Sequence, residues 1–381
     1  MSNAEAMNCA EKIRIIHVVG RMQPGGTEIR TLELMQHLDR NRYQFDFCAL
    51  SGLPGDLDHE VQSLGGKVHY CSIHDFRFVR KFMRLLGAER YQVVHSHVHM
   101  MSGAVLALAF FAGIPVRIAH FRSSRAVPNP SPMRSVREFL LKRLIGLMAT
   151  HILSVSRSTM IDAWYDDWYN DARCRVVYCG VDMTRFQSLG DPIAVRSEFG
   201  VLPDSTLLIH VGNFTEAKNH SKLLTVFAEL LAQTDRCYLL LVGEGSLRAH
   251  IENRIDELQL RGHVILAGRR RDVPRLLAAS DLMIFPSLWE GLPGSVLEAV
   301  AAGVPVLASD IPAMAEIQAC FDQVYSVGLT ESDLNWAQKA LDILRLPRQK
   351  YPFADCDIAP FSIKTSAQEM CAIWESASRD D

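Results

Sequence analysis

Short apolar runs alternate with segments of helical periodicity throughout the first half of the chain. The apolar runs predict strands at 14–19, 43–50, 67–71, 93–95, 117–120, 151–154 and 175–178. Apolar residues near every third or fourth position predict helices at 27–38, 74–86, 101–112 and 136–149. Strands that alternate with helices in this way are typical of a parallel sheet with helices on both faces.

The same alternation starts again in the second half. Strands are predicted at 207–211, 238–242, 264–267, 282–285 and 304–308, with helices at 219–231, 247–258, 273–279 and 294–302. Glycine, aspartate and proline interrupt the periodicity around 180–203, as is typical of a domain boundary. With 381 residues, the chain is long enough for two domains. We therefore predict an α/β fold with one domain at 13–185, a second at 186–345, and a tail at 346–381 whose helix packs back toward the first domain.

The composition indicates the class of protein and the compartment in which it works. Hydrophobic residues make up 48% of the chain and charged residues 22%, as in an ordinary globular protein. Nine cysteines form no Cys-x-x-Cys pair, which argues against a zinc knuckle and favours a reducing compartment. No apolar run reaches the roughly 18 residues of a membrane-spanning helix. A cytoplasmic protein is therefore expected.

Charge is divided unevenly between the two halves. Residues 1–185 carry 23 Lys and Arg against 17 Asp and Glu, whereas residues 186–381 carry 17 against 26. A basic half suits a phosphorylated or membrane-bound partner, although chance asymmetry explains it equally well. Residues 76–90 and 136–148 mix basic and apolar side chains, as in a helix that lies on anionic lipid or in a helix with one solvated face. The slightly negative net charge argues against a nucleic-acid partner.

Two adjacent glycines, Gly25 and Gly26, follow the first predicted strand and directly precede a helix. Glycine lets the backbone approach a ligand closely, and the free N–H groups of a helix N-terminus attract anions, so a diphosphate is a natural partner. A tight turn with Thr27 as the helix cap fits the same residues. The segment lacks the G-x-G-x-x-G spacing, which argues against a nicotinamide cofactor.

A second signal, His95-Ser96-His97, stands at the end of a predicted buried strand, where a parallel sheet presents ligand-binding residues. One of these histidines could contact a sugar hydroxyl. His95 and His97 share a face of the strand and could instead be a metal-ligand pair, or both could be structural. The sequence shows no matching cluster of Cys, Asp or His elsewhere, so we expect no metal.

A pair of glutamates is the strongest signal of the second half. Glu290 stands in a loop and Glu298 in the following helix, which begins at Gly294-Ser295 and so makes an anion site at its N-terminus. One carboxylate could accept hydrogen bonds from a ribose, and the other could hold a sugar. In an earlier strand-to-helix loop, Lys218 could neutralise a leaving phosphate. A solvated lysine and a helix-stabilising glutamate are the plainer interpretations of the same residues.

In combination, these segments resemble the retaining GT-B glycosyltransferases of glycosyltransferase family 4. The loop and helix at 286–299 resemble the E-x7-E signature of that family. The segments that resemble its other motifs are 25–28, 95–97, 177–182 with Phe186, 242–245, 302–306 and Glu316. The resemblance covers most of the chain and implies two Rossmann-like domains that face a central cleft. The first domain would bind the acceptor and the second would bind most of the nucleotide-sugar donor.

The resemblance also implies a role for each site residue. Glu298 would bind the donor ribose, Glu290 the donor sugar, Lys218 the diphosphate and His97 the transferred sugar. The other donor-binding positions would be Gly25, Gly26, Gly212, Asn213, Gly291, Leu292, Pro293, Gly294 and Ser295.

Four arginines, and one position that lacks an arginine, bear on how phosphate is bound. Where the family usually has an arginine that helps the lysine, this chain has the uncharged Asn213. We therefore expect Lys218 to bear more of the load, with help from Arg269 or Arg270. In the loop after a first-domain strand, Arg122 and Arg125 could meet a phosphorylated acceptor.

The expected reaction is hexosyl transfer, with retention at the anomeric carbon, from a UDP- or GDP-linked sugar to an acceptor hydroxyl in polysaccharide or glycolipid assembly. No cofactor or metal is expected, since Lys218 and the helix that begins at Gly294 can stabilise the departing diphosphate. By the same resemblance, the acceptor would be a carbohydrate or a lipid-linked sugar, and peripheral contact with the cytoplasmic face of the inner membrane is a further hypothesis. A sugar-nucleotide epimerase and a non-catalytic nucleotide-sugar-binding protein are the alternatives.

Overall fold

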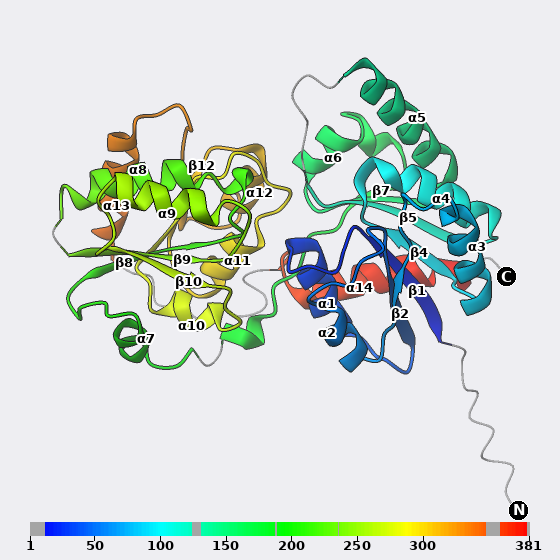
Figure 1. The fold of residues 1–381 in the computed structure, drawn as a ribbon, viewed down its shortest axis with the longest axis horizontal. Coiled ribbons are helices and arrows are strands. Elements are labelled where there is room, and N and C mark those ends of the chain that lie inside the picture. Colours follow the sequence, from blue (N-terminus) through cyan, green and yellow to red (C-terminus); the bar gives the residue numbers. More distant parts are fainter. Residues whose placement is uncertain (1–11, 124–130, 187–188, 235, 348–358, 379–381) are drawn as a thin grey trace, which may run out of the picture.

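The computed structural model describes residues 12–123, 131–186, 189–234, 236–347 and 359–378. Two parallel β-sheets, each with helices on both faces, form two domains that lie side by side (Figure 1). This arrangement confirms the predicted α/β fold with two Rossmann-like domains. None of the described helices is both long enough and apolar enough to cross a membrane.

The first sheet has seven parallel strands in the order β3-β2-β1-β4-β5-β6-β7. The strands are β1 (Ile13–Val19), β2 (Tyr43–Ala49), β3 (Val68–Tyr70), β4 (Val93–Ser96), β5 (Val116–Phe121), β6 (His151–Ser154) and β7 (Cys174–Val176). The central strand β4 is buried along its whole length, as expected for a parallel sheet that is covered on both faces.

Two groups of helices cover the first sheet. The apolar residues of one face pack against α1 (Gly26–Gln36), α2 (Asp58–Ser63) and the C-terminal α14 (Ile363–Trp374). Those of the other face pack against α3 (Phe78–Glu89), α4 (Ser102–Phe111), α5 (Pro132–Met148) and α6 (Arg157–Ala163).

The second sheet has six parallel strands in the order β10-β9-β8-β11-β12-β13. The strands are β8 (Thr206–Val211), β9 (Cys237–Val242), β10 (Val264–Gly268), β11 (Leu282–Phe285), β12 (Val306–Ser309) and β13 (Val324–Val327). One face packs against α7 (Pro192–Glu198), α10 (Val273–Ala278), α11 (Gly294–Ala301) and α12 (Pro312–Gln318). The other packs against α8 (His220–Leu231), α9 (Arg248–Glu257) and α13 (Asp333–Leu344).

Both sheets contain the same switch in strand order. Strand β1 lies between β2 and β4, and β8 lies between β9 and β11. The connections that leave β1 and β4 diverge to opposite faces of the first sheet, and those that leave β8 and β11 do the same in the second. Open α/β sheets bind ligands at such a point, outside the carboxyl ends of the strands. The loops after β1, β4, β8 and β11 are therefore the places where a ligand is expected, and they carry the motifs found in the sequence.

The chain returns from the second domain to the first through its C-terminal helix. Phe361 is buried in the core of the second domain, whereas α14 (red in Figure 1) packs against the first sheet. Ser362 pairs with Val181 in an isolated parallel bridge. A Cβ on Gly180 would lie 2.3 Å from Cα of Ile363, so a residue with a side chain would block this crossing.

Two helix starts differ from the sequence-based prediction. Helix α3 begins at Phe78 rather than at residue 74, because the Asp75 carboxylate accepts a hydrogen bond from the backbone N–H of Arg77 and holds a turn there. Helix α5 begins at Pro132 rather than at residue 136, because Ser131 caps it. The elements α2, α6, α7, α12, α13 and β13 are absent from the prediction.

Trp374 on α14 should contribute strongly to the stability of the first domain. Its side chain is fully buried, and its ring contacts those of His17, Tyr43, Phe45 and His95. Trp374→Ala should lower the free energy of unfolding by about 3–5 kcal/mol, as measured with denaturant, because it leaves a large cavity. Native-state hydrogen exchange should locate the loss in β1 and β2.

The matched control is Trp336→Ala on α13, which removes an equally buried ring from the second domain. Hydrogen exchange in this variant should accelerate in the second sheet instead. If Trp374→Ala accelerated exchange equally in both sheets, α14 would not belong energetically to the first domain.

Candidate active site between the two domains

Loops from the carboxyl ends of the two sheets touch each other. The side-chain amide of Asn213, after β8, donates to the backbone carbonyl of Pro24, after β1, at 3.1 Å. Ser156 Oγ of the first domain donates to the carbonyl of Gly291 in the second at 2.7 Å. A Cβ on Gly291 would lie 2.2 Å from the carbonyl oxygen of Arg122, so glycine permits this approach. The predicted donor and acceptor loops therefore meet at one interface.

The first-domain glycines lie at the start of α1. Gly25 is the N-cap, and no side chain caps the helix, so Thr27 does not have the capping role that was its alternative interpretation. Free backbone N–H groups at such an end suit an anion. Apart from its chain neighbours and the backbone of its own helix, no described atom lies within 4 Å of the place that a Cβ on Gly26 would take. The corresponding place at Gly25 lies 2.6 Å from a carboxylate oxygen of Glu28, which folds back over the helix end.

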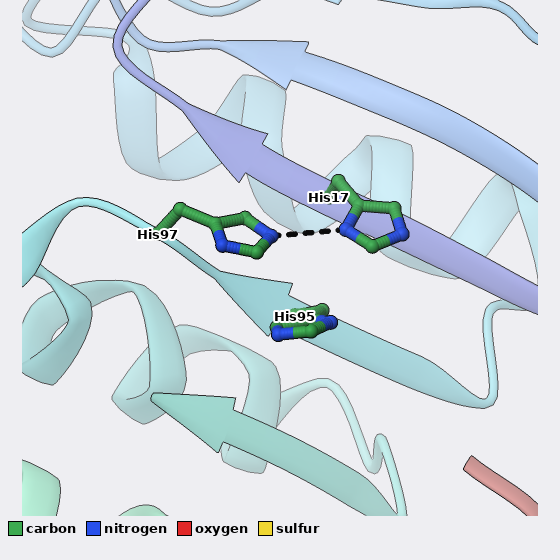
Figure 2. Close-up of side chains that lie close together, drawn as sticks. All are labelled: His17, His95 and His97. Atoms are coloured by element: carbon green, nitrogen blue, oxygen red, sulfur yellow. Dashed lines mark hydrogen bonds between the residues drawn. The ribbon is translucent and has the colours of Figure 1, made fainter. Parts of the chain in front are cut away.

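Four histidines cluster at the carboxyl ends of β1, β4 and β5. Figure 2 shows His17 of β1 beside His95 and His97, and His120 of β5 stacks on His95 with ring centroids 5.2 Å apart. His17 Nδ1 and His97 Nε2 lie 3.0 Å apart, as do His95 Nε2 and His120 Nδ1. Burial lowers the pKa of all four rings, so they are neutral near pH 7.

Arg122 fixes the hydrogen-bonding state of His97. Its Nε donates to His97 Nδ1 at 3.2 Å, and because a guanidinium has no acceptor, Nδ1 must accept. The proton of neutral His97 is then on Nε2, which donates to His17 Nδ1. Arg122 Nη1 also contacts Cys179 Sγ at 2.9 Å. Arg122 therefore lies beside His97, whereas Arg125, the other predicted acceptor residue, lies outside the described residues.

The structure brings a third ring to the two histidines that could be metal ligands. His17, His95 and His97 offer nitrogens that all lie within 4.8 Å of one another. Both nitrogens of His97 are already engaged, by Arg122 and His17, and the charge of Arg122 opposes a second cation. A metal would have to break these contacts, and the expectation that none is needed stays a prediction.

Lys218 and Glu290 face each other in the second domain. Lys218 ends a short 3-10 turn after β8 (Glu216–Lys218), and its Nζ lies 2.6 Å from Oε1 of Glu290, in the loop after β11. A Cβ on Gly212 would lie 3.0 Å from Lys218 Cε, so glycine leaves room for the lysine stem. Both side chains are mostly buried, at 17% and 13% exposed, and a charge in such a place is stable only with a partner. The structure therefore brings these two predicted catalytic groups together.

The loop after β11 leads into α11, which begins at Gly294 without a side-chain cap. The residues that lead into and start this helix are Gly291, Leu292, Pro293, Gly294 and Ser295. Glu298, one turn into the helix, is 8% exposed, and its Oε1 lies 2.7 Å from Nη2 of Arg30. The glutamate predicted to bind ribose is thus held by a cation from the first domain.

Sequence reasoning missed the arginines that reach this interface. Arg30 stands one helical turn after Gly26 on the same face of α1, and that spacing is the signal that could have found it. Arg185, from the segment between the domains, lies 2.6 Å from Oε1 of Glu33, which also pairs with Arg30. No local pattern marks Arg185, because its partner is distant in the sequence.

The two arginines expected to help Lys218 are held by other carboxylates. Arg269 lies 3.0 Å from Asp56 across the interface, where both side chains are about half exposed. Arg270 pairs with Asp272 and Glu198 within the second domain. Neither Arg269 nor Arg270 is therefore well placed to supply the positive charge that an arginine at position 213 would have given to the diphosphate.

Glu28 should make stability depend on pH. Burial raises the pKa of its carboxyl group to about 7 from an ordinary value of 4.5, and a backbone hydrogen bond and the charge of Arg122 only partly offset this shift. Because the folded state binds the proton more tightly, this stabilising contribution is complete at low pH and is lost as the pH rises from about 4.5 to 7. Glu28→Gln, which cannot ionise, should therefore gain stability relative to the wild type between about pH 5 and pH 8.

Denaturant unfolding of both proteins across this range measures the difference in free energy of unfolding. A difference that stays constant with pH would mean that Glu28 ionises normally in the folded protein.

Two family models match the chain. The model for Glycosyltransferase Family 4 matches residues 24–185, and the model for Glycosyl transferases group 1 matches residues 194–346. The first range contains most of the first sheet and the second contains the whole of the second sheet. Each domain therefore has its own match.

Two curated relatives and one solved structure match this chain over most of its length and of their own. The capsular polysaccharide biosynthesis glycosyltransferase CapH of Staphylococcus aureus is 30% identical over 96% of this chain and 99% of that protein. The UDP-Gal:alpha-D-GlcNAc-diphosphoundecaprenol alpha-1,3-galactosyltransferase of Escherichia coli is 25% identical over 79% of this chain and 80% of that protein. The crystal structure of Anabaena HepE in complex with UDP and glucose has a TM-score of 0.77 at 17% identity, over 96% of this chain and 100% of that chain.

Proposed function

The chain belongs to glycosyltransferase family 4 and is a hexosyltransferase with the GT-B fold, and we propose that it transfers a hexosyl group with retention from a UDP- or GDP-linked sugar. The proposed acceptor is a hydroxyl of a carbohydrate or of a lipid-linked sugar, in polysaccharide or glycolipid assembly. CapH supports the polysaccharide setting by its name. The Escherichia coli relative supports a UDP-linked donor and a lipid-linked acceptor.

The Lys218–Glu290 ion pair is the observation that carries this proposal. It holds an ammonium group in a mostly buried place after β8, next to the loop whose Asn213 touches the first-domain glycine loop. A diphosphate can replace the carboxylate as the partner of this ammonium group. In a site that excludes water, such a fixed charge stabilises a departing anion far more than it would in water.

The transfer itself exchanges one bond for another. The bond between the anomeric carbon and the diphosphate oxygen breaks, and its electron pair stays with the diphosphate. The acceptor oxygen forms the new bond and gives up its proton to the departing diphosphate. Lys218 and the N–H groups at the start of α11 stabilise the negative charge that develops, so no metal is required.

Other residues are proposed to orient the donor. Oε1 of Glu298 lies 2.7 Å from Arg30 and 3.9 Å from Arg185, and this carboxylate is proposed to accept hydrogen bonds from the ribose hydroxyls when the donor binds. His97 is neutral because burial lowers its pKa, so it does not compete with Lys218 for the diphosphate. Its ring is proposed to contact the transferred sugar. When Lys218 turns to the diphosphate, the Glu290 carboxylate can accept a hydrogen bond from a sugar hydroxyl.

A donor screen followed by turnover tests the proposal. Thermal stabilisation by UDP-, GDP- or ADP-sugars identifies the donor, and NMR of the product with an acceptor establishes whether the anomeric configuration is retained. Turnover should be unchanged by EDTA. A sugar that changes without acceptor would indicate an epimerase, and stabilisation without turnover on any acceptor would indicate a non-catalytic binding protein.

Lys218→Ala should lower turnover about 10²–10³-fold, because the departing diphosphate loses its nearest fixed charge. Circular dichroism should show an intact fold. The control is Lys222→Ala, which removes a lysine four residues later that pairs with Asp333 at 2.7 Å. This variant should keep near-normal turnover. Near-normal turnover of Lys218→Ala would refute the leaving-group role.

We also propose that the first domain docks on the cytoplasmic face of the inner membrane through α5. Apolar side chains that repeat along this helix are exposed, among them Val136, Leu140 and Leu147 at 60%, 56% and 74%. The basic residues Arg137 and Arg143 flank them and are also exposed. Helix α4, which packs between α3 and α5, adds the exposed rings of Phe110 and Phe111. Figure 1 shows these helices on the outer side of the first domain. A basic, apolar face of this kind suits anionic lipid.

The double variant Leu140→Asp/Leu147→Asp should bind vesicles that contain phosphatidylglycerol at least about tenfold more weakly than the wild type, since each leucine would bury apolar surface in the membrane. Co-sedimentation at low and high salt is the measurement, and wild-type binding should weaken with salt. Leu202→Asp, at an exposed second-domain leucine, is the control and should bind normally. Equal binding of all three proteins would contradict docking through α5.

A further inference from the structure

Arg30 reaches from the first domain onto the predicted donor site of the second. Its Nη2 lies 2.7 Å from Oε1 of Glu298, and its Nη1 lies 2.5 Å from Oε2 of Glu33 on its own helix. The side chain is 11% exposed, as are both glutamates. Arg30 therefore pairs with a donor-binding residue across the interface, and it lies closer to Glu298 than Arg185 does, whose Nη1 is 3.9 Å from the same oxygen.

The guanidinium also lies against the first residue of α11. A Cβ on Gly294 would stand 2.9 Å from Nη2 and 3.0 Å from Nε of Arg30, so the absence of a side chain at Gly294 leaves room for the cation. A helix N-terminus carries partial positive charge and repels a cation. Arg30 holds this place because Glu298 compensates it, and an anion at the same place would attract both the helix end and the guanidinium.

The charges around Arg30 allow it to change partners. Burial lowers the pKa of Arg30, but the charges of Glu298 and Glu33 outweigh burial and raise it above its ordinary value, so the group is always a cation. Arg185 Nη1 lies 2.6 Å from Oε1 of Glu33, so Glu33 keeps a partner if Arg30 moves. Ribose hydroxyls can then take the place of Arg30 on Glu298.

A diphosphate needs more positive charge than Lys218 alone supplies. It carries more than one negative charge, and the position where the family resemblance implies arginine is the neutral Asn213, whose amide is used on Pro24. A guanidinium matches phosphate oxygens with two parallel hydrogen bonds. Arg30 is a buried guanidinium at the helix end where the diphosphate is proposed to bind.

We propose that Arg30 is a donor-binding residue that contacts the diphosphate from the first domain and supplies the charge that Asn213 lacks. The inference rests on the proposed function, because it requires a nucleoside diphosphate at α11. Donor binding exchanges the Arg30–Glu298 pair for a Glu298–ribose contact and an Arg30–diphosphate contact. The donor thereby links the two domains.

Calorimetric titration with a series of nucleotides tests this proposal. The wild type and Arg30→Gln are titrated with UDP, UMP and uridine, or with GDP, GMP and guanosine if the wild type prefers the guanine base. Loss of a charge-assisted contact should weaken diphosphate binding about tenfold or more. The monophosphate should lose less, and the nucleoside should lose nothing or gain, because Glu298 is no longer blocked.

Three further variants calibrate the result. Glu298→Gln removes the ribose ligand and should weaken the three compounds equally. Arg271→Gln removes the exposed pair with Glu60 between the domains and should leave the binding of all three compounds unchanged, because exposed ion pairs contribute little. Because Arg30→Gln leaves an excess of buried carboxylate, the double variant Arg30→Gln/Glu33→Gln restores the charge balance and should show the same graded loss.

Each other outcome overturns the inference. Equal weakening of the three compounds in Arg30→Gln would mean that Arg30 only orients Glu298. Unchanged binding of all three would mean that Arg30 only joins the domains. If the wild type bound neither UDP nor GDP, the proposed function would fail and the role of Arg30 would fail with it.

Discussion

In a parallel sheet every strand ends at the same edge, and this constraint determines where the chemistry of the protein can lie. Each domain gathers its loops at the carboxyl ends of β1 and β4 or of β8 and β11, beside the switch in strand order. Contacts from Asn213 to Pro24 and from Ser156 to Gly291 show that these two edges meet. Glycines in these loops allow the backbone of one domain to approach the backbone of the other, because they have no side chain. A ligand between the domains would touch residues that are far apart in the sequence.

The charged groups at this interface are paired with one another. Lys218 with Glu290 and Arg30 with Glu298 each combine a cation and a carboxylate that are mostly buried. A buried charge of this kind is costly unless it is compensated. Within each pair, the two side chains stabilise each other's charge, and the pair adds little to the net stability of the protein. A nucleotide sugar offers both kinds of replacement partner, since its diphosphate suits the cations and its hydroxyls suit the carboxylates. The site can thus exchange internal pairs for ligand contacts with little change in the number of unpaired charges.

The sequence predicts those parts of the site that depend on local spacing. Gly25 and Gly26 before a helix, and Glu290 and Glu298 eight positions apart, are visible because loop and helix follow each other directly. Arg30, Arg185 and His17 escape sequence reasoning because their partners come from other strands or from the other domain. The starts of α3 and α5 were misplaced for a smaller reason, since single capping side chains set them and not the apolar period. Apolar periodicity therefore locates most elements of both sheets, whereas partners across the interface require the folded chain.

The central claim is that a nucleoside diphosphate lies between the two domains, held by cations and backbone N–H groups from both. A crystal structure of the wild-type protein with UDP or GDP bound tests it most directly. Electron density for the diphosphate should lie between Gly26 and Gly294, in contact with Lys218, with the ribose on Glu298. Density at the outer helices, or at the histidine cluster without contact to Lys218, would contradict it.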